Sequence, residues 1–449
     1  MYAVIGAGPM GLAVARNLDR QGIAFTGFEL HCDVGGLWDI DNPHSTMYET
    51  AHLISSKTTT EFAEFPMPEG VATYPRHDAM CRYFRSYARH FDLLRHYEFS
   101  TRVIGMKRDG DGWLVTTESG GRRQTRRFAG VLIASGTLHH PNMPRFEGAF
   151  SGTLMHAADY RSPSQLTGKR VLVVGCGNSG ADIAVDAVHH AASVDISVRR
   201  GYYFIPKFIF GKPTDTLGGK LKLPRRLKQI LDSLLVRAVM GKPSQYGLPD
   251  PDYRMYESHP VMNSLILHHI GQGDIGPRSD IARLDGSGVV FADGKRGEYD
   301  LILLATGYKL DYPFIDRSEL NWPRQAGAPR LYLNVFHPDH DNLFMMGMIE
   351  AAGLGWEGRN KQAELAALYI RGLAEGVPAA ARLKDVKARL ATERIDGGYA
   401  YLDLERMAYY VHKDSYRAAV ASHADELRRQ LGSVTPGAAR INHRVEVQS

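Results

Sequence analysis

Apolar runs alternate with amphipathic stretches along the first 200 residues of the chain. An apolar run at 2–5 leads through a glycine-rich turn into a stretch with Leu12 and Leu18 on one helical face, and a second apolar run ends at Glu29. The same succession recurs at residues 170–200. Strands that alternate with helices in this way predict βαβ units around parallel sheets. The pattern therefore predicts an α/β fold that contains the same unit twice.

Three later apolar runs predict further strands of the same sheets: 131–137, 301–308 and 342–348. We expect two Rossmann-like domains, because each βαβ unit has its own later strand. Residues 1–155 and 310–449 are predicted to form a discontinuous first domain, and residues 156–309 a second domain inserted into it. Within the second domain, residues 201–277 are an irregular excursion rich in Gly, Pro and Tyr.

The excursion contains one amphipathic pattern, which predicts a helix over 227–238. Its apolar positions are Leu227, Ile230, Leu231, Leu234 and Leu235. Basic residues gather near its start: Lys220, Lys222, Arg225, Arg226 and Lys228. We expect this helix to form a lid or a contact between the subunits of a homodimer rather than to bind a membrane surface. The last residues, 434–449, are predicted to be a loosely held tail.

The first glycine-rich turn has the spacing of a dinucleotide-binding loop. Gly6, Gly8 and Gly11 follow a strand and open a helix, and Glu29 lies 18 residues beyond the last glycine. Glycines at these positions let backbone N–H groups approach a pyrophosphate at the helix N-terminus, and the acid can accept hydrogen bonds from ribose hydroxyls. A structural turn would explain the glycines alone, but not the whole arrangement.

The second unit repeats the glycines as Gly175, Gly177 and Gly180 but ends on Arg199 and Arg200. Two guanidinium groups suit the 2′-phosphate of NADPH, whereas an NAD site carries an acid there. The alternative is two solvated arginines at a strand end. The pattern favours NADPH over NADH as the ligand of this unit.

Two dinucleotide sites in one chain imply a permanent redox carrier and a reductant. The first unit is the predicted FAD site, because the sequence GGLWD at 35–39 adds a second glycine pair that could admit a pyrophosphate. Trp38 could cover the cofactor, or it could simply belong to the core. The chain is therefore expected to bind FAD and NADPH.

Composition excludes several other classes of protein. The 449 residues are 44% hydrophobic and 23% charged, and the net charge of +5 is spread along the chain, which does not indicate nucleic acid as a partner. Cys32, Cys81 and Cys176 lie far apart, without the spacing of a dithiol or metal site. With no predicted membrane span and no leader, the expected location is the cytoplasm.

The chain resembles class B flavoprotein monooxygenases, specifically the bacterial type of flavin-containing monooxygenase. The family fingerprint FxGxxxHxxxY is present as Phe150, Gly152, His156 and Tyr160. The turn at 305–308 and the GNSGAD loop also match. The resemblance implies a fold like that of the FAD/NAD(P)-dependent disulfide-reductase-like flavoproteins, with His156 as a link between domains. It also implies that NADPH reduces FAD, that oxygen adds to form a flavin hydroperoxide, and that an amine or sulfide takes one oxygen atom.

The resemblance implies a set of cofactor-binding residues. For FAD they are Gly6, Gly8, Pro9, Met10, Gly11, Glu29, Gly36, Leu37, Trp38, His52 and Gln362. For NADPH they are Gly175, Gly177, Asn178, Ser179, Gly180, Arg199, Arg200 and Thr306. Three alternatives to N- or S-oxygenation stay open: Baeyer–Villiger oxidation of a ketone, an NADPH oxidase that releases hydrogen peroxide, and a flavoprotein that serves only as a scaffold.

One segment departs from the family pattern. Relatives carry YxxxxxNSxK, and their asparagine, which lies near the reactive flavin carbon, falls on Ile54. Isoleucine donates no hydrogen bond. His52 would face the same side of an extended segment, and Ser55 follows directly, so both are candidates to replace the missing donor. We expect His52, Ile54 and Ser55 to surround the activated oxygen, with a greater leak to hydrogen peroxide than in relatives.

Two further segments are predicted to line the approach to the site. They are 202–210, rich in aromatic residues, and the HPVMNS stretch, in which Asn263 aligns with an asparagine of relatives. The alternative is that these aromatic residues cover the core of the second domain. The substrate is expected to be a small molecule together with dioxygen, and no residue of the sequence identifies it further.

Overall fold

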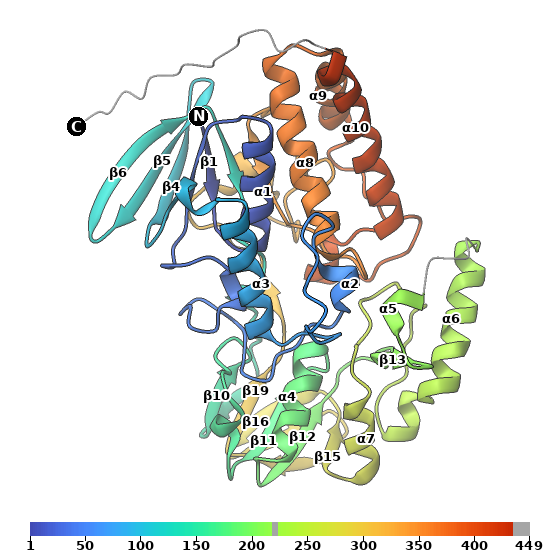
Figure 1. Cartoon of the computed structure of the whole chain (residues 1–449). Helices are drawn as coiled ribbons and strands as arrows, with labels where there is room; N and C mark the ends of the chain where they lie inside the picture. The colour runs from blue at the N-terminus through green and yellow to red at the C-terminus, as the bar shows by residue number, and fades with distance from the viewer. Residues whose placement is uncertain (218–222, 434–449) are drawn as a thin grey trace.

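Five parallel strands form the sheet of the first domain, in the order β21-β7-β1-β2-β3 (Figure 1). The computed structural model describes residues 1–217 and 223–433. The strands are β1 (Tyr2–Ile5), β2 (Phe25–Phe28), β3 (Tyr97–Glu98), β7 (Gly130–Ile133) and β21 (Leu343–Met345). The helices of this domain are α1 (Pro9–Arg20), α2 (Lys57–Thr60), α3 (His77–His90), α8 (Gly355–Ala374), α9 (Pro378–Leu390) and α10 (Lys413–Ser433).

Helices cover the sheet because each presents an apolar face to it. Helix α1 packs on α8, and α8 in turn packs on α10 (Figure 1). An antiparallel sheet lies against the other side of the domain, with strands β4 (Arg102–Asp109), β5 (Gly112–Ser119) and β6 (Arg122–Phe128). The C-terminal helices therefore belong to the first domain, although the second domain separates them from it in the sequence.

The second domain repeats the same parallel topology, in the order β10-β19-β11-β12-β15. Its strands are β10 (Thr153–His156), β11 (Arg170–Val174), β12 (Ser193–Ser197), β15 (Ile275–Arg278) and β19 (Leu301–Leu304), and its main helices are α4 (Asn178–Val188) and α7 (Leu265–Gln272). A second sheet covers one face, with strands β9 (Gly148–Phe150), β16 (Ile281–Gly286), β17 (Gly288–Phe291) and β18 (Arg296–Glu298). The predicted pair of Rossmann-like domains is confirmed.

The first boundary between the domains lies nearer to residue 148 than to residue 156. Strand β9 pairs with β16, and β10 pairs with β19, so both belong to sheets of the second domain. Their partners lie more than 130 residues further along the chain. The hydrophobic pattern of 148–156 alone could not show this pairing.

The excursion forms a small hairpin, β13 (Phe208–Ile209) and β14 (Lys212–Pro213), followed by α5 (Thr214–Leu217) and α6 (Arg225–Met240). Helix α6 stands at the edge of the molecule (Figure 1). Its apolar residues are exposed: Leu227, Ile230, Leu231, Leu234 and Leu235. Its inner face is mixed, because Gln229 is buried and donates to the Met255 carbonyl at 2.9 Å, while Val236 packs in a small hydrophobic cluster. The predicted helix exists, with its apolar face turned outward.

Two expectations fall outside the described residues: the role of Lys220 and Lys222, and the tail at 434–449. Within the part of the chain that the structure describes, no helix has the length and apolar character needed to cross a membrane. The remaining short strands, β8 (His140–Pro141) and β20 (Tyr308–Lys309), pair with each other where the chain passes between the domains.

Candidate active site

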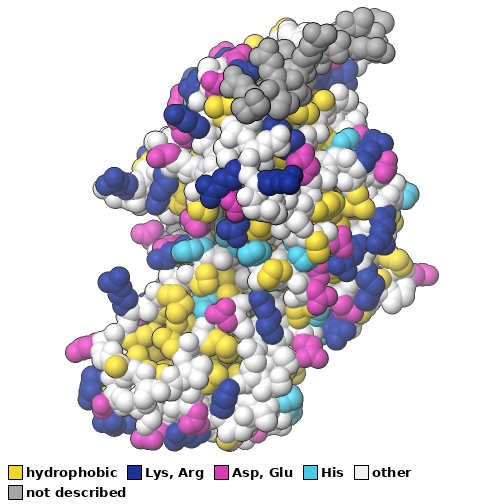
Figure 2. Space-filling view, turned by 90° about the vertical axis from the view of Figure 1, so that its left-hand side faces the viewer, with side chains coloured by type: hydrophobic (Ala, Val, Ile, Leu, Met, Phe, Trp, Pro, Cys, Tyr) yellow, Lys and Arg dark blue, Asp and Glu magenta, His cyan; other side chains and the backbone are white. Residues whose placement is uncertain are grey.

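One cavity of about 1780 Å³ lies between the two domains, and both glycine-rich turns open onto it. The carboxyl ends of β1, β7 and β21 border it from the first domain, and those of β11, β12 and β19 border it from the second. Ligands of parallel α/β sheets bind at this edge, where the strand order reverses. In the space-filling view the surface narrows at this level, and histidine side chains gather there (Figure 2).

The first glycine-rich turn leaves the start of α1 free to meet a phosphate. Gly6 has φ +103°, and a Cβ on Gly11 would lie 1.9 Å from the Gly6 carbonyl oxygen. A Cβ on Gly36 would lie 2.9 Å from the Gly8 Cα. Only glycine fits these three positions, so the backbone N–H groups at the helix N-terminus stay accessible. This cradle fits the pyrophosphate of FAD.

Glu29 lies at the end of β2, as a ribose-binding acid should. It is 7% exposed and lines the cavity. Its carboxylate accepts hydrogen bonds from the backbone N–H groups of Ala7, at 2.5 Å, and His31, at 2.8 Å. Burial raises the pKa of Glu29, and these two N–H groups partly oppose that effect. They hold the carboxylate at the rim of the glycine-rich turn.

Most of the other residues predicted to bind FAD lie on the wall of the cavity. Pro9, Met10, Gly36, Leu37 and Trp38 line the cavity, and Trp38 also packs against the main core of its domain.

Gln362 does not line the cavity. It is 1% exposed, its Oε1 accepts from the Gly347 N–H at 2.8 Å, and its Nε2 donates to the Tyr416 hydroxyl at 2.7 Å. Gln362 instead fixes the turn after β21, and Gly347 on that turn borders the cavity. The structure therefore places the Gln362 amide inside the protein, where both of its ends have partners, and not on the wall predicted to meet FAD.

The second glycine-rich turn has the same geometry. Gly175 has φ +101°, and a Cβ on Gly180 would lie 2.1 Å from the Gly175 carbonyl oxygen. Gly177, Asn178 and Ser179 line the cavity at the start of α4. The turn therefore fits a second pyrophosphate.

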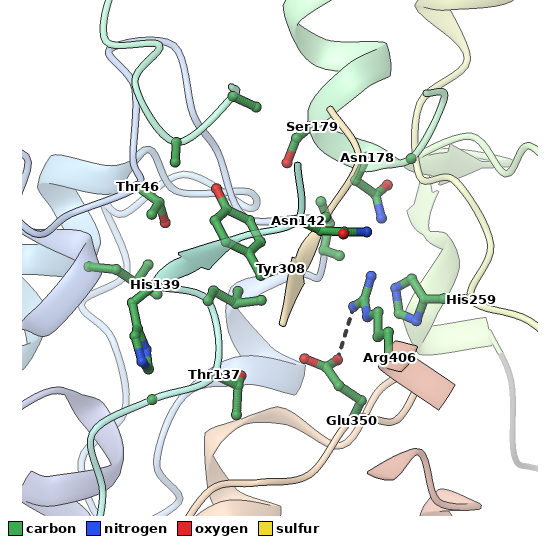
Figure 3. A pocket seen from close by; sticks show the side chains of 18 of the residues that line it. Thr46, Thr137, His139, Asn142, Asn178, Ser179, His259, Tyr308, Glu350 and Arg406 are labelled. Carbon is green, nitrogen blue, oxygen red and sulfur yellow. Dashed lines mark hydrogen bonds and ion pairs between the residues drawn. The ribbon is translucent and has the colours of Figure 1, made fainter. Parts of the chain in front are cut away.

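Side chains around this turn are ordered by contacts with neighbouring loops. The Asn178 Oδ1 accepts from the Met262 N–H at 2.7 Å, and the Thr306 hydroxyl donates to the Asn142 carbonyl at 2.6 Å. Asn178 and Asn142 face the same part of the cavity (Figure 3). Met262 belongs to the HPVMNS stretch, so this stretch reaches the nucleotide site through its backbone.

The two arginines at the end of β12 both line the cavity. Arg199 is exposed. The Arg200 guanidinium lies 5.0 Å from the centre of the Tyr202 ring, and its Nη1 is buried without a protein partner in the described part of the chain. An unpaired guanidinium nitrogen beside a phosphate cradle is what a 2′-phosphate site requires. This geometry fits NADPH.

The fingerprint residues link the two domains, and only His156 lines the cavity. The His156 Nε2 donates to the Gly307 carbonyl at 3.1 Å, and its Nδ1 accepts from the Ala158 N–H at 3.0 Å. Burial lowers the pKa of His156. The ring is therefore neutral, with both nitrogens used, and it acts as a structural link.

The other three fingerprint residues are also structural. A Cβ on Gly152 would lie 2.7 Å from the Asp300 carbonyl oxygen, and Phe150 packs against the core between the two sheets of the second domain. The Tyr160 hydroxyl donates to Asp186 at 3.1 Å.

Two acids on α4 join the domains, and sequence reasoning gave them no role. Asp182 accepts from the Tyr48 hydroxyl at 3.4 Å and from the Asn263 amide at 2.6 Å. Asp186 accepts from the Thr50 hydroxyl. Burial raises the pKa of both acids, and these donors oppose the rise. Their spacing of four residues on one helix was the only local signal, and their partners Tyr48, Thr50 and Asn263 lie more than 80 residues away.

The segment that departs from the family pattern borders the cavity with His52, Ile54 and Ser55. Leu53 between them is 5% exposed and packs in the core, so the predicted alternation holds. The His52 Nδ1 donates to the Thr50 carbonyl at 2.6 Å, and the Ser55 hydroxyl is hydrogen-bonded to Thr60 at 2.8 Å. The Nδ1 proton of His52 is therefore taken up by the chain itself. The expected compensation by His52 as a donor is not favoured by this geometry.

A partly buried charged cluster lines the cavity, and sequence reasoning did not find it. The Arg406 Nη2 donates to Glu350 at 3.0 Å, and His259 lies beside Arg406 (Figure 3). The His259 Nδ1 lies 3.0 Å from the Tyr410 hydroxyl. Glu350 follows β21, Arg406 and Tyr410 belong to the C-terminal segment, and His259 belongs to the excursion of the second domain. No local pattern connects these residues.

The cluster gives a prediction for the pH dependence of stability. Burial and the neighbouring charge of Arg406 lower the pKa of His259 to about 3. In the unfolded chain this histidine binds a proton below about pH 6.5, whereas in the folded protein it stays neutral. Stability therefore falls as pH decreases from 6.5 towards 3, by about 1.4 kcal/mol per pH unit.

His259→Gln should flatten this dependence between pH 6.5 and 5, where the histidine costs up to about 2 kcal/mol. Urea unfolding of both proteins at several pH values measures the slopes. His268→Gln, at an exposed position of α7, is the control and should keep the slope of the unchanged protein. Equal slopes for His259→Gln and the unchanged protein would show that His259 is protonated in the fold.

The amino-acid sequence of this chain is similar to those of known flavoproteins. The family model described as "FMO-like: Flavin-binding monooxygenase-like" matches residues 1–427. The chain is 31% identical over 395 residues to "Flavin-containing monooxygenase 5" of Oryctolagus cuniculus, covering 83% of this chain and 73% of that protein. It is 32% identical over 398 residues to "Dimethylaniline monooxygenase [N-oxide-forming] 2" of the same species, with the same two coverages.

A solved structure shows the same fold. The crystal structure of OTEMO in complex with FAD and NADP superposes with a TM-score of 0.71 at 17% identity, covering 96% of this chain and 98% of that one.

Proposed function

We propose that this chain, which belongs to the flavin-binding monooxygenase-like family, oxygenates the nitrogen or sulfur atom of a small soft nucleophile. The chain is a flavin-containing monooxygenase, and its cofactors are FAD and NADPH. The observation that carries the proposal is that two dinucleotide cradles open onto one cavity of about 1780 Å³. Such a cavity can hold both cofactors and a substrate together.

When bound, FAD supplies the route by which electrons from NADPH reach dioxygen. The chain's own residues bind, orient and exclude water. Gly6, Gly11 and Glu29 hold one dinucleotide, and Gly175, Gly180 and Arg200 hold the other. Ile54 presents an apolar side chain to the cavity between them. A soft nucleophile reacts without a protein acid or base, so the protein mainly needs a shielded pocket.

NADPH consumption tests the proposal when it is measured with amines, sulfides and ketones, together with the oxygenated product and hydrogen peroxide. We expect amines or sulfides to yield product in proportion to the NADPH consumed. Esters formed from ketones alone would indicate Baeyer–Villiger oxidation instead. Consumption that yields only hydrogen peroxide with every compound would contradict the proposal.

An NADPH oxidase is the second candidate function, and the environment of Ile54 favours it. Ile54 donates no hydrogen bond, the His52 Nδ1 proton is used by Thr50, and the Ser55 hydroxyl is paired with Thr60. Losing one preorganised donor at a developing charge costs on the order of 3 kcal/mol. Activated oxygen in this cavity would therefore be lost as hydrogen peroxide more readily than with an amide at position 54.

Ile54→Asn should reduce this loss. The asparagine amide can donate into the cavity, so we expect the hydrogen peroxide released per NADPH to fall by at least about threefold. A peroxidase-coupled assay alongside product analysis measures the ratio. Ile54→Val keeps an apolar side chain and should leave the ratio unchanged. If the two variants give the same ratio, residue 54 contributes only packing.

We also propose that the enzyme acts in the cytoplasm, because a reducing compartment suits a chain whose three cysteines are all free in the structure. A homodimer is a further proposal, and the exposed apolar face of α6 supports a contact of this kind. Light scattering of the purified protein measures its mass and tests the dimer directly.

A further inference from the structure

The cavity has a third part beyond the two dinucleotide cradles. The excursion borders it with Tyr256 and residues 258–260, and the C-terminal segment borders it with residues between 399 and 414. Neither stretch carries a phosphate-binding turn. This part of the cavity is therefore available to the substrate, and the Glu350–Arg406 pair lies in its wall.

Arg406 is incompletely paired in this wall. Its Nη2 donates to Glu350 at 3.0 Å, and its Nε is buried without a hydrogen-bond partner in the described part of the chain. The side chain is 42% exposed, whereas that of Glu350 is 13% exposed, and both line the cavity. The exposed part of Arg406 thus faces the cavity and can donate to a ligand. A planar guanidinium donates two parallel hydrogen bonds to a carboxylate.

His259 offers another donor at the same place. The Tyr410 hydroxyl accepts from the Ala352 N–H and lies 3.0 Å from the His259 Nδ1. In the tautomer whose Nδ1 accepts the Tyr410 proton, the neutral ring carries its own proton on Nε2. His259 and Arg406 lie side by side in the cavity (Figure 3). Donors from both domains therefore meet at this wall.

Cations outnumber carboxylates immediately around Glu350, whereas Asp403, Glu405, Lys413 and Asp414 line the cavity further along the C-terminal segment. Arg359 is a second cation near Glu350, and its guanidinium donates to the Gly355 carbonyl at 3.3 Å and the Ile349 carbonyl at 2.9 Å. With His259 neutral, Arg359, Arg406 and Glu350 sum to one positive charge. A buried charge is costly unless it is paired. One carboxylate from a ligand would neutralise the cluster.

We propose that Arg406 and His259 bind a carboxylate of the substrate, so that the preferred substrates are sulfides or amines that carry a carboxylate group. Glu350 is then a positioning residue that holds the Arg406 guanidinium. This inference rests on the proposed oxygenation of soft nucleophiles. The inference adds to that proposal a chemical class of substrate. The carboxylate of such a substrate would hold it so that its sulfur or nitrogen atom points towards the flavin site.

A matched pair of sulfides tests the inference on the unchanged enzyme. 3-(Methylthio)propanoate and 3-(methylthio)propanamide have nearly the same shape, but only the first is an anion. Hydrogen bonds between charged groups are worth roughly 1.5 to 3 kcal/mol, so kcat/KM should be roughly 10- to 100-fold higher for the acid. Thioanisole, a neutral sulfide, is measured in parallel to report on sulfide oxygenation itself.

Paired substitutions test the residues. Glu350→Gln with Arg406→Gln removes the donating guanidinium together with the carboxylate that holds it, while Arg359 keeps its two carbonyl partners. The ratio of kcat/KM between acid and amide should fall to near one. Arg406→Lys keeps the charge and should retain part of the ratio. Glu426→Gln with Arg382→Gln removes an exposed ion pair between α9 and α10 and should leave the ratio unchanged.

Binding without turnover gives an independent readout. In the FAD-loaded enzyme without NADPH, the acid should raise the melting temperature and the amide should not, because only a ligand of the folded state stabilises it. This shift should disappear in the Glu350→Gln, Arg406→Gln double variant. It also shows whether that variant is folded.

The outcomes separate the inference from the proposed function. Oxygenation of thioanisole without any preference for the acid, in rate or in melting temperature, would overturn the inference and leave the proposed function intact. The double variant could instead show a higher KM for NADPH and an unchanged ratio of kcat/KM between acid and amide. That result would assign the Glu350–Arg406 pair to the nicotinamide cofactor, and it would also overturn the inference. If no sulfide or amine is oxygenated, the proposed function fails, and the melting temperatures still decide whether a carboxylate binds.

Discussion

Gly11→Ala should yield a protein that is purified without FAD. The added Cβ would lie 1.9 Å from the Gly6 carbonyl oxygen, a contact with backbone that no side-chain rotation relieves. Either α1 or the turn must move, and the N–H groups that meet the pyrophosphate then lose their alignment. Strain of this kind in a core element costs on the order of 3 kcal/mol or more. The ratio of flavin absorbance to protein absorbance, together with thermal unfolding, measures the effect.

Two matched glycine variants make this result specific. Gly180→Ala creates the equivalent contact at the second turn, 2.1 Å from the Gly175 carbonyl oxygen, and should keep FAD but lose reduction by NADPH. Gly70→Ala meets nothing within 4 Å and should change neither property. Normal FAD content in Gly11→Ala would show that the turn adapts and that the cradle is less rigid than its geometry implies.

Replacing both arginines at the end of β12 should abolish the preference for NADPH. Arg200 has a buried guanidinium nitrogen without a partner among residues 1–217 and 223–433, and Arg199 lies beside it on the cavity wall. Each hydrogen bond from a charged donor to the 2′-phosphate contributes roughly 1.5 to 3 kcal/mol. We expect Arg199→Gln with Arg200→Gln to raise the KM for NADPH by roughly 100-fold and to change the KM for NADH little.

Anaerobic reduction of the flavin by each nucleotide measures this change without any substrate. Arg226→Gln, at an exposed position of α6, removes a charge away from the cradle and should leave both constants unchanged. If the double variant loses NADPH and NADH to the same extent, the two arginines support the fold of the loop and do not read the 2′-phosphate.

Sequence reasoning was most successful where function depends on a few consecutive residues. The glycine spacing of each turn, the acid at Glu29 and the arginines after the second unit were all found, and the structure places them on one cavity. A tight turn that must approach a phosphate restricts its own sequence, so its signal is local. Gln362 is the exception, since its contacts with Gly347 and Tyr416 depend on packing that the sequence does not show.

The sequence by itself determined that this protein has two βαβ units and an amphipathic helix in its excursion, through the alternation of apolar and polar residues. The glycine spacing determined the two dinucleotide cradles. Only the tertiary structure decided that the apolar face of α6 points outward, because burial depends on what surrounds a helix. It also decided that His259 meets Arg406 and Glu350 across the domain boundary. These residues come from segments far apart in the chain, and long-range packing leaves no periodic trace in any one of them.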